Sequence, residues 1–304
     1  MDQKWWSGET VAVVTGANRG IGLEIVRQLA RKGMTVVLTC RNEKNGLAAM
    51  KEVGEAGLDN VRFHILDVQS SQSVSDLAKW LKTIFGGFDI LINNAAVSGQ
   101  DMNWEVMNKT GVDLRQLLLS SEGSNETCVY DYESARTCID INYYGTKRVV
   151  KGLQPLLRET FGRPRIVNVT SVYGLVKMMP NPELQKQLSD IDKVSEEFLD
   201  SMVSQFLEDV KQNKNLEEKG WPVPFSGYKM SKICINTYTR LLARELSDKV
   251  TVNCVHPGYV KTGMTGGTGD LSPSEGAESV VKLALSPPGG PSGNFYIEKE
   301  IGGF

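Results

Sequence analysis

Near the N-terminus, a short apolar segment, a glycine-rich turn and a helical pattern follow one another directly. Residues 10–15 are long enough for a strand buried on both faces of a parallel sheet, and residues 16–22 form the turn. The helical pattern then places Ile21, Ile25 and Leu29 on one face. Glycine at such a junction allows the backbone to approach a phosphate and directs helix N–H groups toward it. This order predicts a nucleotide-binding unit; an ordinary strand-to-helix turn is the alternative.

Alternating strands and helices continue along the rest of the chain. Strands are predicted at residues 34–39, 61–66, 88–93, 165–170, 250–255 and 294–297, and helices at 43–56, 73–85, 131–157 and 274–285. Strands that alternate with helices form parallel sheets through right-handed crossovers. We therefore expect an α/β fold with one Rossmann-type, doubly wound parallel sheet of about seven strands. Because we find no linker, internal repeat or low-complexity segment, we expect a single domain over residues 1–304.

A long helical insert, at about residues 174–225, separates the fifth predicted strand from the next predicted helix. Within it, apolar residues recur at spacings of three and four from Ile191 to Val210, opposite a charged face. This pattern predicts a strongly amphipathic helix of about 20 residues. Such a helix should lie against the body of the protein.

Some helix boundaries can also be predicted. Ser226 is expected to cap a helix that ends near Leu246, and Ser274 is expected to cap the helix at residues 274–285. The polar segment after the fourth strand should contain one short helix near Trp104.

The end of the second predicted strand bears on cofactor choice. NAD-binding proteins usually have Asp or Glu at about this place, where it binds the ribose hydroxyls. This chain has Thr39, Cys40 and Arg41 there instead. Arg41 and Arg19 could bind the 2′-phosphate of NADP(H) through charge-assisted hydrogen bonds. Both could alternatively be ordinary exposed arginines, but their place at the expected adenosine end favours the phosphate interpretation.

Further candidate residues follow other strands, because ligands bind outside the carboxyl ends of parallel strands. Asn94 could instead belong only to a tight turn. The candidates for binding a cofactor are Gly16, Asn18, Arg19, Gly20, Ile21 and Gly22 in the glycine turn, Asp67 and Val68 after the third strand, and Asn94 and Ala95 after the fourth.

Tyr228 and Lys232 are four residues apart in a predicted helix and therefore lie on one face of it. An ammonium beside a phenol should lower the pKa of the phenol, because the positive charge favours the phenolate. A phenol tuned in this way can donate a proton near neutral pH. By itself the pair is also typical of an amphipathic surface. The pair becomes a catalytic candidate because four other stretches of the sequence are expected at the same site, each at the place where a doubly wound sheet would bring it.

Composition argues against several kinds of function. A net charge of −2 gives no indication of nucleic-acid binding or of binding to an anionic membrane surface, and no segment approaches the length of a membrane span. The N-terminus does not resemble a signal peptide, and five scattered cysteines suit a reducing, cytoplasmic environment. With only His64 and His256, neither a histidine-based metal site nor a Ser-His-Asp triad is supported, so we expect no metal.

Together these motifs resemble the short-chain dehydrogenase/reductase family. Arg19 and Arg41 are similar to its NADP-preferring branch. The insert is similar to that of the monomeric plant salutaridine-reductase and menthone-reductase group, and the chain also resembles animal carbonyl reductases. Ala96 departs from the glycine usual in the family, which is a small change. The matching stretches are residues 15–22, 93–96, Asn142, Ser171, Tyr228 with Lys232, and Pro257 with Gly258.

The resemblance implies NADPH-dependent reduction of a ketone or aldehyde. Tyr228 would donate a proton to the carbonyl oxygen, Lys232 would lower the pKa of Tyr228 and bind the nicotinamide ribose, and Ser171 would hydrogen-bond the substrate. Asn142 would hold a water molecule that supplies protons to Lys232. Further cofactor contacts would come from Pro257, Gly258, Val260 and Thr262, with Thr262 holding the nicotinamide carboxamide.

The substrate is expected to be a medium-sized, apolar, cyclic metabolite of terpenoid or alkaloid type, and the protein is expected to be a monomer. Two alternatives remain: reduction of a conjugated C=C bond, and NADPH sensing without turnover. The intact Tyr228 argues against the first, and the complete catalytic set argues against the second. The substrate pocket should be formed by loops at residues 98–104, 172–179, 221–225 and 259–264.

Overall fold

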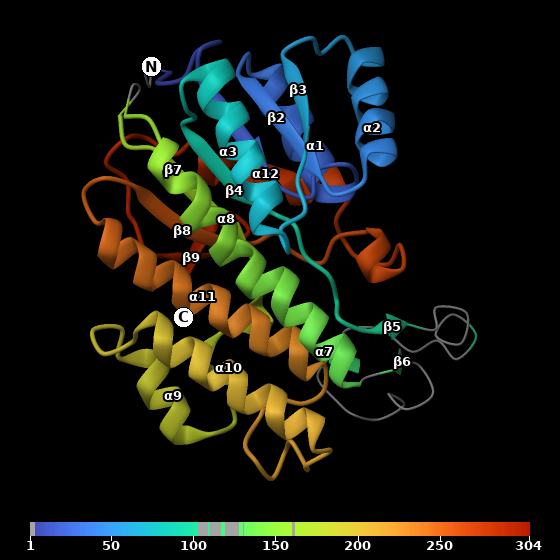
Figure 1. Ribbon diagram of the computed structural model, residues 1–304, viewed down its shortest axis with the longest axis vertical. Helices are drawn as coiled ribbons and strands as arrows, with labels where there is room; N and C mark the ends of the chain where they lie inside the picture. The colour runs from blue at the N-terminus through green and yellow to red at the C-terminus, as the bar shows by residue number, and fades with distance from the viewer. Residues whose placement is uncertain (1–3, 103–108, 110–116, 119–127, 130, 160–161) are drawn as a thin grey trace.

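The computed structural model describes residues 4–102, 109, 117–118, 128–129, 131–159 and 162–304. Its central strands are β1 (Val11–Val14), β2 (Thr35–Cys40), β3 (Val61–Ile65), β4 (Ile90–Asn93), β7 (Arg165–Val169), β8 (Thr251–His256), β9 (Phe295–Ile297) and β10 (Glu300–Gly302). They form an eight-stranded sheet in the order β10-β9-β8-β7-β4-β1-β2-β3 (Figure 1). All pairs are parallel except β9 with β10. The predicted Rossmann-type sheet is confirmed, and β10 adds an edge strand that was not predicted.

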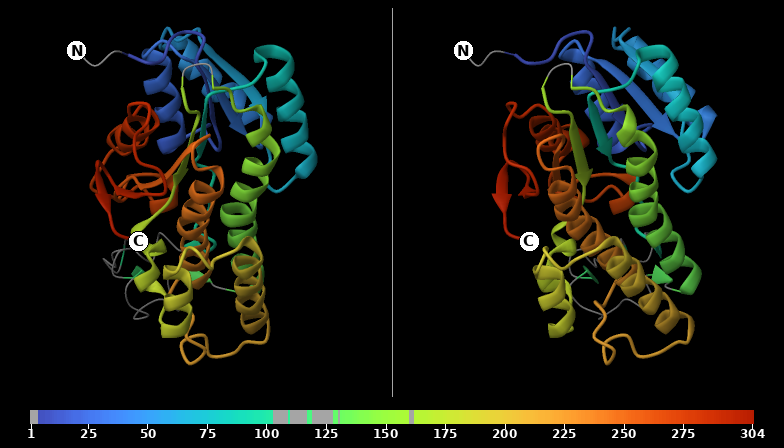
Figure 2. Two further views of the ribbon diagram at one scale, coloured as in Figure 1. Left: turned by 90° about the vertical axis from the view of Figure 1, so that its left-hand side faces the viewer. Right: turned by 60° about the vertical axis from the view of Figure 1, so that its left-hand side comes forward.

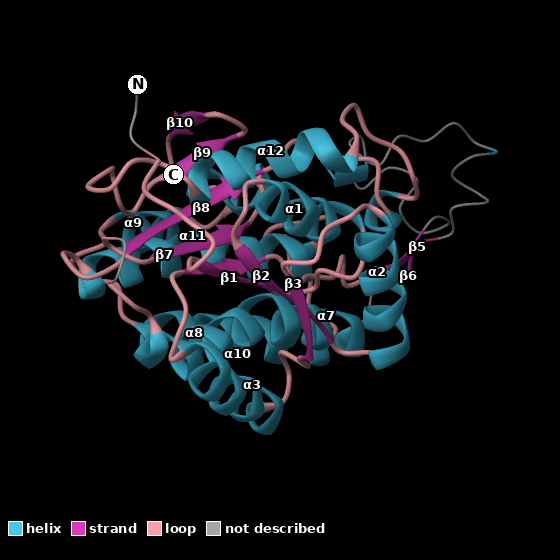
Figure 3. Ribbon diagram, turned by 90° about the horizontal axis from the view of Figure 1, so that it is seen from above, coloured by secondary structure: helices cyan, strands magenta, loops and turns pink. Residues whose placement is uncertain are grey.

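Helices cover both faces of this sheet (Figure 3). Val11 and Val13 of β1 pack into the core on one face, whereas Ala12 and Val14 pack into the core on the other. Successive side chains of a strand point to opposite faces, so a strand between two helical layers must be apolar throughout. One layer contains α1 (Gly20–Arg31), α2 (Glu43–Glu55) and α12 (Pro273–Ala284), and the other contains α3 (Ser71–Phe85), α8 (Gly145–Leu153) and α11 (Ser226–Leu246).

The single helix predicted at residues 131–157 is divided in the structure. It consists of α7 (Tyr132–Ile139), a π-helical turn (Asp140–Tyr144), α8 and a 3₁₀ turn (Gln154–Leu156). A π-helical turn inside an α-helix frequently marks a functional site, and this one contains Asn142. Before α7, β5 (Asp101–Met102) pairs antiparallel with β6 (Cys128–Val129). The short helix predicted near Trp104 lies outside the described residues.

The insert contains two helices, α9 (Pro182–Ser189) and α10 (Glu196–Lys211), at the end of the molecule farthest from the N-terminus (Figure 2). The prediction of one helix from Ile191 to Val210 is wrong at its start, and α9 was not predicted. The Ser195 hydroxyl accepts a hydrogen bond from the Phe198 N–H at 3.2 Å and thereby caps α10. The 16 residues of α10 give a helix of about 24 Å.

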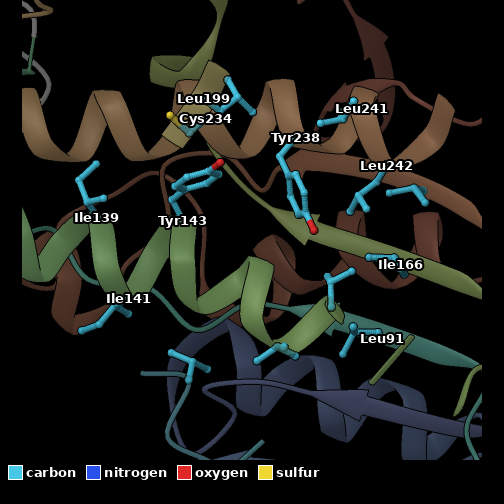
Figure 4. Packing of buried hydrophobic residues seen from close by; sticks show 14 of the residues in the cluster. Leu91, Ile139, Ile141, Tyr143, Ile166, Leu199, Cys234, Tyr238, Leu241 and Leu242 are labelled. Atoms are coloured by element: carbon cyan, nitrogen blue, oxygen red, sulfur yellow. The ribbon is translucent and has the colours of Figure 1, made fainter. Parts of the chain in front are cut away.

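The predicted amphipathic packing of α10 is present, and α10 lies against α7 and α11. Leu199, Val203 and Phe206 are fully buried, and Leu199 lies close to Cys234 and Tyr143 (Figure 4). Polar contacts add to this packing, because the Tyr143 hydroxyl donates to Asp200 at 2.9 Å. The nearly buried Lys147 also pairs with Asp200 at 2.6 Å and with Glu196 at 3.0 Å.

Both serine caps were predicted wrongly. Ser226 is the first residue of α11, and the N-cap position is taken by Phe225 in a left-handed conformation, without a side-chain cap. The N-cap of α12 is Ser272, whose hydroxyl accepts from the Glu275 N–H at 3.2 Å while Glu275 accepts from the Ser272 N–H at 2.8 Å. Pro273 at the first helical position is the sequence signal for this boundary.

Among the helices of the described residues, none combines the length and the apolar character needed to cross a bilayer.

Candidate active site

The glycine turn after β1 is held tightly against the end of β4. Gly16 has a φ of 62°, and a Cβ added to it would lie 2.8 Å from the Cα of Ala95. A Cβ at Gly22 would lie 2.5 Å from Nδ2 of Asn94. Only glycine fits these positions without displacing the neighbouring strand. No side chain in the described part of the chain caps the N-terminus of α1, so its first N–H groups face the space above the turn.

Asn94 braces this turn. Its Nδ2 donates to the carbonyls of Thr15 and Gly16 at 3.0 and 3.1 Å, and its own N–H donates to the Thr15 hydroxyl at 3.0 Å. The Asn94 amide therefore fixes the shape of the glycine turn. This contact matches the tight-turn alternative, although Asn94 also lines the cavity described next.

A cavity of about 600 Å³ lies outside the carboxyl ends of the parallel strands. All the residues predicted to bind a cofactor line it, as does Ser171. Asn142 is not among its lining residues. The cofactor candidates are Gly16, Asn18, Arg19, Gly20, Ile21, Gly22, Arg41, Asp67, Val68, Asn94, Ala95, Tyr228, Lys232, Pro257, Gly258, Val260 and Thr262.

One end of the cavity carries two exposed arginines, Arg19 and Arg41. Neither guanidinium group has an ion pair or a hydrogen bond with any other described residue. Arg19 lies beside Gly263 of the segment after β8, since a Cβ on Gly263 would be 3.8 Å from its guanidinium. Both arginines are available to an anion in the cavity.

Tyr228, Lys232 and Ser171 meet at the other end. Nζ of Lys232 lies 5.6 Å from the centre of the Tyr228 ring and donates to the Val169 carbonyl at 3.2 Å. Tyr228 also interacts with the Ser171 hydroxyl. The Thr170 hydroxyl, one residue earlier, donates to Oδ1 of Asn236 at 2.7 Å. This bond connects the end of β7 to the helix that carries Tyr228 and Lys232.

The pKa values at this end differ from the prediction. Burial raises the pKa of Tyr228 to about 12, although the hydrogen bond with Ser171 lowers it. Burial also lowers the pKa of Lys232 to about 8. The expected lowering of the Tyr228 pKa is therefore wrong for this structure, because burial outweighs the hydrogen bond with Ser171. Tyr228 stays protonated at neutral pH and so holds the proton that a general acid must donate.

Asn142 is fully buried, and both ends of its side-chain amide form hydrogen bonds within the protein. Its Oδ1 accepts from the Val97 N–H at 2.9 Å, and its Nδ2 donates to the Val97 carbonyl at 2.9 Å and to the Ser231 hydroxyl at 3.0 Å. The main-chain carbonyl of Asn142 accepts a hydrogen bond from the Thr146 hydroxyl at 2.7 Å. The water-holding role of Asn142 stays a prediction.

Comparison with protein families decides the classification. The family model described as short chain dehydrogenase matches residues 10–182, which is more than half of the chain. The chain belongs to the short-chain dehydrogenase family. Short-chain dehydrogenases are oxidoreductases that use a nicotinamide cofactor. A second family model, described as enoyl-(acyl carrier protein) reductase, matches residues 215–284.

Named short-chain dehydrogenases resemble this chain over nearly its whole length. Short-chain dehydrogenase/reductase 1 of Saponaria officinalis is 44% identical over 292 residues, covering 95% of this chain and 94% of that protein. (+)-Neomenthol dehydrogenase of Capsicum annuum is 42% identical over 304 residues, covering 95% and 96%. The solved structure of salutaridine reductase from Papaver somniferum has a TM-score of 0.87 at 42% identity, covering 95% of this chain and 99% of that one. The predicted resemblance to plant reductases is confirmed.

The cavity of this short-chain dehydrogenase also contains a histidine that the sequence patterns did not single out. His256 is the last residue of β8, and its side chain lines the cavity. Burial, and then the charge of Lys232, lower its pKa to about 4. His256 is therefore neutral at physiological pH. His256 lies at the carboxyl end of a parallel strand, as several other cavity residues do, and this position is the sequence signal that could have indicated its place in the cavity.

The cavity beyond Ser171 is apolar and aromatic. Leu117, Leu118 and Phe225 form a buried cluster against which Met102, Tyr173, Tyr228 and Tyr259 pack. Each of the four predicted substrate loops contributes at least one lining residue. These residues include Ser98 and Met102 from the first loop, Tyr173 from the second, Phe225 from the third, and Tyr259 and Met264 from the fourth.

We expect the catalytic efficiency to fall as the pH rises through about 8. The pKa of Lys232 is lowered to about 8, so its ammonium is present below that pH and is lost above it. Efficiency should fall because this ammonium is the group expected to bind the nicotinamide ribose. The profile of kcat/KM reports the pKa values of the free enzyme, so it should be measured from about pH 6 to 10.

Lys229 provides the control for this profile, because burial lowers its pKa to about 8 as well. The fall in kcat/KM should persist in Lys229→Met. A fall that disappears in this variant would assign the titration to Lys229, and a flat profile would show that the charge of Lys232 is not required.

Proposed function

We propose that this protein uses NADPH to reduce the carbonyl group of a medium-sized, apolar, cyclic ketone or aldehyde to an alcohol. The observation that carries the proposal is that Tyr228, Lys232 and Ser171 line the same cavity as the glycine turn and the two unpaired arginines. Relatives named for neomenthol and salutaridine support a substrate of terpenoid or alkaloid type. Oxidation of NADPH in the presence of a panel of cyclic ketones and enones tests it.

The described residues fit a nicotinamide dinucleotide. The glycine turn and the uncapped N-terminus of α1 can approach phosphate oxygens, and the guanidinium groups of Arg19 and Arg41 are unpaired. Thr262, which lines the same cavity, would hold the carboxamide. When bound, the cofactor supplies the hydride, and the protein supplies orientation and electrostatics.

The protein's contribution to the reaction is to hold the substrate carbonyl and to deliver a proton. The hydroxyls of Ser171 and Tyr228 would both donate to the carbonyl oxygen, which fixes its direction and favours negative charge on it. Tyr228 would transfer its proton to that oxygen, since an alkoxide is more basic than a phenolate. The aromatic cluster around Phe225 would keep bulk water away from this step.

We expect Arg41→Asp to weaken NADPH binding about 10- to 100-fold and to improve the relative binding of NADH. Charge-assisted hydrogen bonds contribute roughly 1.5–3 kcal/mol, and each 1.4 kcal/mol corresponds to about a factor of ten. A carboxylate at this position repels a 2′-phosphate and can accept a hydrogen bond from a ribose hydroxyl. Titration of protein fluorescence with each cofactor measures both affinities.

Arg31→Asp is the matched control, because Arg31 is exposed and lies outside the cavity. It should leave the ratio of the two affinities unchanged. Wild-type protein that binds NADH as tightly as NADPH would contradict the proposed preference.

Two alternative functions predict different outcomes in the panel assay. Reduction of a conjugated C=C bond would consume NADPH only with enones and would leave the carbonyl intact. A regulator that senses NADPH would bind the cofactor but would not oxidise it, whichever carbonyl compound is added. The hydroxyls of Tyr228 and Ser171 favour carbonyl reduction over both, because they meet at the substrate end of the cavity.

We also propose that the protein is a monomer. Helix α10 covers the outer faces of α7 and α11, which would otherwise present apolar surface. Light scattering at micromolar concentration should give a mass close to the 33.5 kDa of one chain. A stable dimer would contradict this proposal.

A further inference from the structure

Lys229 occupies an unusual environment for a lysine. Its side chain is 5% exposed, and its Nζ donates to the Val223 carbonyl at 2.9 Å. None of the described carboxylates pairs with it. It also lies in the first turn of α11, where the helix dipole opposes a positive charge. Burial lowers its pKa to about 8. Packing alone does not explain the lysine, because a methionine would fill the same space without a buried charge.

The segment that Lys229 holds leads directly to the substrate end of the cavity. Phe225 has a φ of 58° and a ψ of 40°, a left-handed conformation that is unfavourable for a residue with a Cβ. Its side chain is nevertheless buried, belongs to the apolar cluster with Leu118 and Tyr228, and lines the cavity. The bond from Lys229 to Val223 is made two residues before this turn. It therefore supports a backbone path that places an aromatic ring beside the candidate general acid.

We propose that Lys229 is a positioning residue for the substrate: by holding the Val223 carbonyl, it fixes Phe225 as a wall of the cavity beside Tyr228 and so sets selectivity for bulky apolar carbonyl compounds. This inference rests on the proposed carbonyl reduction. A bulky cyclic ketone would pack its ring against Phe225, whereas a small aldehyde held by Ser171 and Tyr228 would have little apolar surface to pack there.

The test compares Lys229→Met with the wild type at saturating NADPH, using one bulky cyclic ketone and one small aldehyde. Catalytic efficiency for the ketone should fall about tenfold or more, mainly through KM, and that for the aldehyde by less than about threefold. Phe225→Ala should show the same selective loss. The double variant should lose no more than Phe225→Ala alone, because two substitutions that act through one contact are not additive.

Two further variants separate positioning from a purely structural role. Lys229→Arg keeps a donor of similar reach and should retain the wild-type ratio of ketone to aldehyde efficiency. If Lys229→Met folds poorly, Phe225→Ala still tests whether the Phe225 wall sets selectivity, and equal losses on both substrates in that variant would overturn the proposal. Lys249→Met makes the same substitution at an exposed lysine after α11 and should match the wild type.

Equal losses on both substrates in Lys229→Met, additive losses in the double variant, or a changed ratio in Lys229→Arg would each overturn the proposal. A wild-type protein that reduces neither substrate would instead contradict the proposed function.

Discussion

Replacing Tyr228 by phenylalanine should lower kcat by roughly 10²- to 10⁴-fold while NADPH binding stays close to that of the wild type. The phenyl ring keeps its packing in the aromatic cluster, and only the hydroxyl that holds the transferable proton is lost. Steady-state NADPH oxidation measures kcat, and fluorescence titration measures cofactor affinity. Near-normal turnover of a ketone would point to another acid or to reduction of a C=C bond.

Tyr238→Phe is the matched control for this loss. Tyr238 lies on the same helix, and its buried hydroxyl has no hydrogen-bond partner in the described part of the protein. It is not among the residues that line the cavity. This variant should keep wild-type turnover, so the effect at Tyr228 can be assigned to the position of the hydroxyl.

Phe206→Glu should reduce the free energy of unfolding by about 4 kcal/mol or more. Phe206 is fully buried, and its ring meets that of Trp221 edge-on at 5.6 Å. Loss of a buried aromatic ring costs about 3–5 kcal/mol, and an unpaired buried carboxylate adds to this. If α10 detaches, the apolar faces of α7 and α11 become exposed, giving aggregation or a new dimer. Denaturant unfolding and light scattering measure the two effects.

Ser201→Glu introduces the same charge at an exposed position of α10 and should change stability by less than about 0.5 kcal/mol. Phe198, which the sequence pattern suggests equally well for this test, is only partly buried and is the weaker choice. A soluble, fully stable monomer carrying Phe206→Glu would show that α10 covers nothing.

The parallel sheet was predictable because its strands lie between two helical layers. Val11 to Val14 must all be apolar for that reason, and the same constraint marks the other central strands. Helix ends were harder to predict. The true start of α10 depends on Ser195, whereas the apolar stripe continues back to Ile191, which packs on the same core from outside the helix. The edge strand β10 has three residues, which is too short a stretch for a periodic pattern to indicate a strand.

The candidate site was predictable to the extent that residues at strand ends must meet at one edge of the sheet. The pKa values and hydrogen-bond partners within the site could not be predicted from the sequence. The raised pKa of Tyr228 depends on burial by segments distant in the sequence, and the partners of Asn142 include Val97 and Ser231. The contact of Lys229 with Val223 requires a turn at Phe225 that no sequence pattern indicates. The single-domain organisation and the cytoplasmic location stay predictions.

The most direct test of the proposed reaction is product analysis with NADPH that carries deuterium at the transferable position. With a cyclic enone as substrate, carbonyl reduction predicts one alcohol formed for each NADPH oxidised, with the deuterium on the former carbonyl carbon and the C=C bond retained. A saturated ketone with deuterium at the β-carbon, or cofactor binding without any deuterated product from a panel of carbonyl compounds, would contradict it.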